Sequence, residues 1–98
     1  MVTPQGDEDH AWLDVKRRWP PGTRVRGRAT HHVPFGAFLD LGVAGIQGLI
    51  RVTDLIPELR PLAPEDFPPI GAEVEATVVG FNDHNHQVLL SLIQRDTG

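Results

Sequence analysis

Hydrophobic and polar residues alternate with a period of two along most of the chain between residues 22 and 92. This alternation is typical of strands that bury one face. It occurs in TRVRGRAT, in GAFLDLG, and in the pair AEVEATVVGF and QVLLSLI. With GIQGLIRVTDL, which we expect to be the third strand, five strands are predicted. In GAFLDLG, alternation places Ala37, Leu39 and Leu41 toward the core, and therefore Phe38 and Asp40 should face outward. The other residues expected to face inward are Val25, Gly27, Ala29, Val74, Ala76, Val78, Val88, Leu90 and Leu92.

The N-terminal part of the chain has a helical pattern instead. The segment DEDHAWLDVKRRW begins with acids and ends with basic residues, which matches the helix dipole, and Pro20 and Pro21 then stop the helix. Trp12, Val15 and Trp19 fall on one helical stripe. We expect this stripe to pack on the rest of the domain, and a helix that binds a partner protein is the alternative.

A proline-rich stretch separates the third and fourth predicted strands. The third strand should end in a turn or a helical start at Thr53 and Asp54, and IPELRPLAPEDFPPIG then has five prolines in sixteen residues. That proline content excludes a regular strand, so we expect a loop with at most a turn of helix near PEDF. Five strands with one long irregular connection predict an all-β fold, a five-stranded Greek-key OB-fold barrel with a short N-terminal helix. The predicted divisions are an arm and helix at 1–21, the barrel domain at 22–95 and a tail at 96–98.

Composition narrows the classes of protein. The 98 residues contain no cysteine, no stretch resembling a signal peptide and no apolar run long enough for a bilayer, so we expect one cytoplasmic domain with no membrane contact. The net charge of −4 argues against a generic nucleic-acid binder. However, six of the nine basic residues lie between positions 16 and 28, so one face could attract an anion. A solvated mixture of charges is the alternative. The six are Lys16, Arg17, Arg18, Arg24, Arg26 and Arg28.

The sequence offers little for catalysis. The only serine, Ser91, lies in an apolar strand, and neither cysteine nor tyrosine is present, so we do not expect an enzyme. Two histidine pairs at 31–32 and at 84 and 86 offer metal ligands, but they fall in different predicted loops, so neither a metal nor another cofactor is expected.

Residues from about 22 to 95 resemble the S1-type RNA-binding domain family, the repeated module of a ribosomal small-subunit protein. The matching pieces are GTRVRGRAT, PFGAFLDLG, GLIRVTDL, IGAEVEATVVGFN and VLLSL, in the order and spacing of the family. The resemblance implies a five-stranded OB barrel that binds single-stranded RNA with little sequence preference.

The resemblance also implies site residues. The stacking aromatics of the family correspond to Phe35 and Phe38, a basic residue of the first strand corresponds to Arg28, and a common histidine is replaced by Arg51. A common acid corresponds to Asn82, and a common basic residue falls near His86 or Gln87. The expected RNA-binding set is Phe35, Phe38, Arg28, Arg51, Arg26, His32, Asn82 and His86.

The sequence is compatible with two functions. The first is a small monomeric module that binds single-stranded RNA weakly, with the ribosome or another ribonucleoprotein as a candidate partner. The second is a protein-protein interaction module on an OB scaffold with reduced RNA affinity, which the acidic balance would allow. We favour RNA because aromatic and cationic side chains are predicted together on one outward face.

Overall fold

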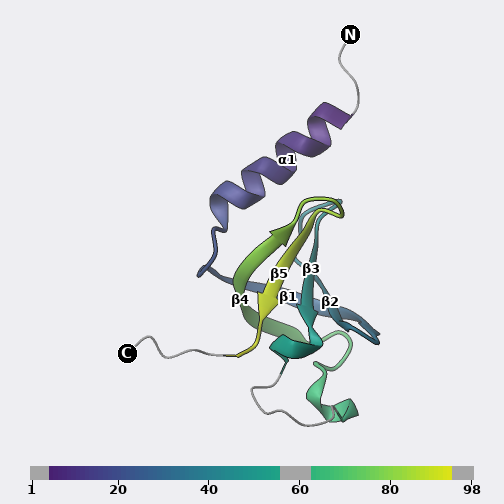
Figure 1. Cartoon of the computed structure of the whole chain (residues 1–98). Helices are drawn as coiled ribbons and strands as arrows, with labels where there is room; N and C mark the ends of the chain where they lie inside the picture. The colour runs from purple at the N-terminus through teal and green to yellow at the C-terminus, as the bar shows by residue number, and fades with distance from the viewer. Residues whose placement is uncertain (1–4, 56–62, 94–98) are drawn as a thin grey trace.

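Five strands close into a β-barrel, and one α-helix lies outside it, in a computed structural model that describes residues 5–55 and 63–93 (Figure 1). The predicted fold class is therefore confirmed. Two short 3₁₀ turns follow β3 and precede β4, and the predicted helical start at Thr53 is the first of them. The elements are α1 (Gln5–Arg18), β1 (Arg24–Val33), β2 (Gly36–Asp40), β3 (Gln47–Arg51), η1 (Val52–Asp54), η2 (Pro64–Asp66), β4 (Glu73–Asn82) and β5 (Gln87–Ser91).

The strand order around the barrel is β1-β2-β3-β5-β4, and β4 returns to pair with β1. All pairs are antiparallel except β3 with β5, which run in the same direction. This parallel pair places the long connection between β3 and β4 at one end of the barrel, where the predicted proline-rich loop lies. Residues 63–71 of that loop contain η2 and no strand, and residues 56–62 lie outside the described residues.

Alternating residues of the strands fill the barrel as predicted. Leu39, Ile50 and Leu90 are fully buried, and Val25 is nearly so. Glycine is required where strands cross closely: a Cβ at Gly36 would overlap the carbonyl oxygen of Ile50 on β3. The barrel interior is therefore packed with side chains and leaves its outer surface as the place for a ligand.

Helix α1 packs on the barrel through the predicted stripe. Trp12 and Val15 are buried in the same cluster as the barrel core, and Trp19 packs against it while partly exposed. Leu13, on another side of the helix, is 53% exposed. No helix in residues 5–55 or 63–93 combines the length and the apolar character that crossing a membrane would need.

Candidate nucleic-acid interface

An apolar row crosses the outer surface of the barrel from β2 through β3 to β5. The strand register sets Phe38 beside Leu49, and Leu49 beside Leu89. Leu49 alternates with the core residues of β3 and so faces outward, but it is only 6% exposed because its neighbours cover it. Phe38, which was predicted to face outward, is partly exposed. We call this surface of β1, β2, β3 and β5 the outer face.

A polar row runs beside the apolar one, two residues along each strand. The register sets Arg28 of β1 beside Asp40, Asp40 beside Gln47, and Gln47 beside Gln87. A β-bulge between Ala29 and His31 keeps this row in register while it places His31 beside Phe38. The outer face thus has an apolar centre with hydrogen-bonding side chains along one edge.

Phe35 and Phe38 form an aromatic pair at the turn between β1 and β2. Their ring centroids are 6.0 Å apart and the rings are nearly perpendicular, at 86°. Phe35 is 53% exposed, and its carbonyl oxygen accepts a hydrogen bond of 2.9 Å from the backbone N–H of Val52, which fixes the turn to the end of β3. We call Phe35 and Phe38 the aromatic platform.

Two predicted cations lie on opposite sides of the apolar row. Arg28 lies in the polar row, is exposed, and makes no ion pair with any residue the structure describes. Arg51 lies at the other edge, beside Gly36, and its Nε is 3.4 Å from Oδ2 of Asp54. Asp54 is only 18% exposed and its buried Oδ2 has no hydrogen-bond partner among the described residues, so Arg51 already balances that charge, and Arg28 is the freer of the two cations for a negatively charged ligand.

Arg26 and His32 lie apart from the platform. Arg26 belongs to the part of β1 that pairs with β4, where its guanidinium is 3.7 Å from a carboxylate oxygen of Glu75. The Nε2 of His32 is hydrogen-bonded to the carbonyl oxygen of Pro68, and its ring lies against Phe67. The outer face therefore brings together four of the predicted residues, Phe35, Phe38, Arg28 and Arg51, and leaves these two outside.

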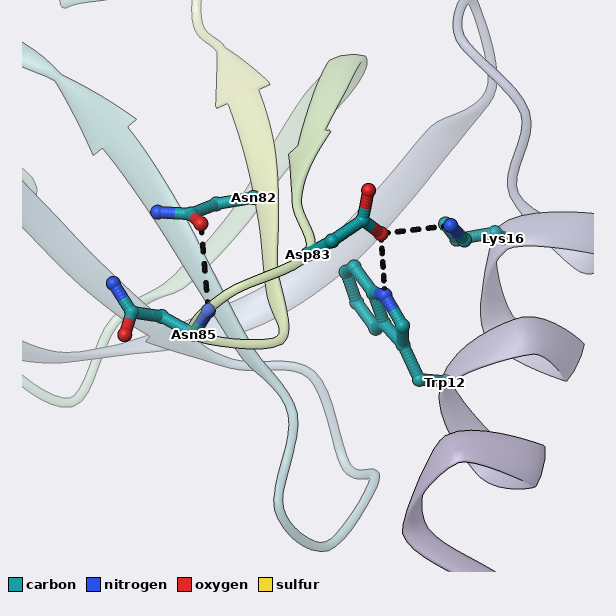
Figure 2. A network of polar contacts seen from close by, with 5 residues as sticks. All are labelled: Trp12, Lys16, Asn82, Asp83 and Asn85. Carbon is teal, nitrogen blue, oxygen red and sulfur yellow. Dashed lines mark hydrogen bonds and ion pairs between the residues drawn. The ribbon is translucent and has the colours of Figure 1, made fainter. Parts of the chain in front are cut away.

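The turn between β4 and β5 binds helix α1 (Figure 2). The indole Nε1 of Trp12 and the Nζ of Lys16 both donate to Oδ1 of Asp83, each at 2.7 Å. These hydrogen bonds, the one from Lys16 most of all and then the one from Trp12, hold the pKa of the Asp83 carboxyl below its usual value. Nothing in the sequence pairs Asp83 with a helix more than sixty positions away, so this anchor could not be predicted.

The last two predicted site residues belong to the same turn. The ring of His86 stacks on Trp12, with centroids 5.1 Å apart and 14° between the planes. Asn82 donates to the side chain of Gln87 at 3.3 Å and accepts from the backbone N–H of Asn85 at 3.4 Å. His86 therefore belongs to the contact with α1, whereas the partners of Asn82 lie in the turn itself and at the start of β5.

The candidates for other chemistry lie elsewhere. Ser91 is buried, and its Oγ accepts a hydrogen bond from the backbone N–H of Ile93. Within residues 5–55 and 63–93, no three histidine, aspartate, glutamate or cysteine side chains come close enough together to hold a metal ion. The sequence reasoning did not identify Leu49 and Leu89, although an apolar residue at an outward position of GIQGLIR was the available signal.

The comparisons with known proteins begin with sequence. No family model matches the chain. The chain is 33% identical over 89 residues to the small ribosomal subunit protein bS1 of Chlamydia muridarum, and the match covers 91% of this chain. The chain spans only 15% of the length of that relative.

Solved structures show the same fold. The solution structure of GSP13 from Bacillus subtilis matches with a TM-score of 0.64 and 19% identity, over 82% of this chain and 64% of that one. RNase R of Mycoplasma genitalium, solved in complex with ribose-methylated single-stranded RNA, matches with a TM-score of 0.66 and 18% identity, over 91% of this chain and 15% of that one. Together with the five-stranded barrel, the sequence similarity to bS1 shows that this chain belongs to the S1-type domain family and has the OB fold.

Proposed function

We propose that this chain binds single-stranded RNA weakly through its outer face, with bases stacked on the aromatic platform and the backbone beside Arg28 and Arg51. The observation that carries the proposal is the exposed, paired arrangement of Phe35 and Phe38 between two cations. Base stacking on aromatic rings tolerates any base, because every base has a π-face. The platform itself should therefore show little sequence preference.

Relatives support this proposal without deciding it. The sequence relatives are named as ribosomal proteins, one structural neighbour was solved with single-stranded RNA bound, and another is titled a putative exosome complex RNA-binding protein. We extend the proposal to a place on the ribosome or another ribonucleoprotein, which would make the protein cytoplasmic. We also propose that the chain acts as a monomer.

The charges on the outer face explain why binding should be weak. The chain carries a net charge of −4, and Asp40 lies in the same row as Arg28. Few phosphates can be neutralised by two cations, one of which already faces Asp54. We expect a dissociation constant on the order of micromolar or weaker at physiological salt.

Fluorescence anisotropy with a short labelled oligouridylate tests the proposal. Phe38→Ala should weaken binding by about 1–3 kcal/mol, because one stacked base loses its platform. Leu13→Ala is the control: it removes a large apolar side chain, more exposed than Phe38, from α1 and should leave the affinity unchanged. Circular dichroism of both variants verifies that they fold.

Two results would contradict the proposal. One is the absence of oligouridylate binding by the wild type at low salt. The other is an unchanged affinity in a folded Phe38→Ala variant. Either result would favour the protein-protein interaction module that the same scaffold could provide.

A further inference from the structure

A cavity of about 470 Å³ opens on the outer face next to the aromatic platform. It is lined by Asp40 and Gln47 of the polar row and by residues 43–46 of the loop between β2 and β3. His31, which the bulge places beside Phe38, lies at the side toward the platform, and Asn85 of the β4–β5 turn completes the lining. The volume lies in the range of small-molecule sites, so a nucleobase fits inside it.

The polar groups of this cavity are free to bind. Oδ1 of Asp40 accepts from the backbone N–H of Gly42 at 2.8 Å, and no described residue donates to Oδ2. The side-chain amides of Gln47 and Asn85 have no hydrogen-bond partner in the parts of the chain that the structure describes. Asp40 is the only acidic residue of the lining, and its negative charge disfavours a phosphate there.

From this arrangement we propose that the cavity binds a guanine base of the RNA strand that lies on the platform. The inference rests on the proposed function. Guanine carries two adjacent N–H donors, N1–H and the 2-amino group, that a carboxylate accepts together, and its O6 and N7 can accept from the amides of Gln47 and Asn85. Adenine and cytosine each offer one amino donor beside a ring-nitrogen lone pair, and uracil offers only N3–H between two carbonyl oxygens, so each gives the carboxylate one hydrogen bond where guanine gives two. The carboxylate therefore selects guanine.

The path from platform to cavity is short. Asp40 follows Phe38 by two residues on the same outward side of β2, which is about 6.6 Å along a strand. That separation is comparable with the distance between neighbouring nucleotides in an extended strand. One base can stack on Phe38 while the next enters the cavity, as proteins commonly recognise the edges of unpaired bases in RNA.

Competition between oligouridylates that differ at one nucleotide tests this inference. The central nucleotide is guanosine, inosine, adenosine or uridine, and inosine is the sharpest comparison because it lacks only the 2-amino group. We expect guanosine to improve affinity by about fivefold or more over inosine. Asp40→Asn keeps an oxygen for the N–H of Gly42 but should remove the preference. Glu75→Gln removes the same charge from β4, outside the cavity, and should keep the preference.

The outcomes separate the two proposals. Equal binding of the guanosine and inosine strands by the wild type, while all strands bind, overturns the guanine site and leaves the RNA function standing. A preference that survives Asp40→Asn also overturns it. Failure of every strand to bind contradicts the proposed function and the guanine site together. Free guanosine monophosphate should compete poorly, because it lacks the stacked neighbour, and competition at the concentration of the oligonucleotide would overturn the assignment to RNA.

Discussion

The two turns at opposite ends of the outer face use aromatic rings in different ways. At the β1–β2 turn, Phe35 meets Phe38 edge to face at 6.0 Å, and Phe35 remains 53% exposed. At the β4–β5 turn, Trp12 meets Phe81 edge to face at 5.7 Å and stacks on His86, yet Trp12 is only 4% exposed. Similar ring geometry thus stabilises the fold at one end and leaves a surface for a ligand at the other.

The difference comes from what covers each turn. Helix α1 brings both an apolar ring and two hydrogen-bond donors to the β4–β5 turn, so its aromatic contacts are closed to solvent. Among the residues that the structure describes, no element covers the β1–β2 turn in this way. A contiguous exposed apolar patch on a folded domain commonly marks an interaction site, which is why the open turn is the functional candidate.

The largest expected effect is a loss of folding stability at the helix-covered β4–β5 turn. Trp12→Ala should destabilise the protein by about 3–5 kcal/mol, because it removes a buried aromatic ring and leaves Asp83 without one donor. Urea unfolding followed by circular dichroism measures this. Leu13→Ala, on the same helix but exposed, should change stability by about 0.5 kcal/mol or less. If a folded Trp12→Ala variant lost oligouridylate binding, the helix-covered turn would belong to the RNA site and the contrast would fail.

A smaller effect tests the electrostatics of the outer face. Arg28→Ala should weaken RNA binding several-fold and lower the slope of log affinity against log salt by about 0.7, the value for one neutralised phosphate on a single strand. Arg26→Ala is the matched control, because Arg26 faces Glu75 on the β4 side of β1 and should change the slope less. Anisotropy titrations at several salt concentrations give both slopes, and equal slopes for the two variants would contradict the assignment of Arg28.

The smallest effect concerns the response of the helix-covered β4–β5 turn to low pH. The pKa of Asp83 is lowered by the hydrogen bonds from Lys16 and Trp12, so the charged carboxylate stabilises the docked helix at neutral pH. This contribution is fully present above the ordinary value of 3.8 and is lost as the pH falls through the lower pKa of the folded state. Tryptophan fluorescence should therefore change as the pH falls below about 4. An Asp83→Asn variant should lack that acid step, and the same step in both proteins would show that another group causes it.

The barrel could be predicted from the sequence because alternation is a local signal. Each strand reports its own buried face, and the five prolines after η1 exclude a strand where none is found in residues 63–69. The aromatic platform was predictable for the same reason, since Phe38 lies between inward residues of β2.

Contacts between side chains leave no comparable local signal in the sequence. Asn82 and His86 were expected to face RNA, yet their observed partners are Gln87, Asn85 and Trp12. His32 adjoins the predicted aromatic turn in sequence, but its ring is directed to Pro68 and Phe67. The side of the barrel that a turn residue faces depends on β-bulges and on contacts with distant segments. The alternation of hydrophobic and polar residues along a strand contains no information about either.

The hydrogen bond between Trp12 and Asp83 joins residues 71 positions apart, so it also bears on the order in which parts of the chain fold. Loop-closure entropy must be overcome before such a distant contact forms, and its acceptor belongs to the final hairpin of the barrel. The Asp83 acceptor is therefore not in place for the helix until the turn between β4 and β5 has formed. The arrival of the Trp12 ring beside His86 is a signal of completed folding, and in kinetic experiments its fluorescence should be the last to reach the native value.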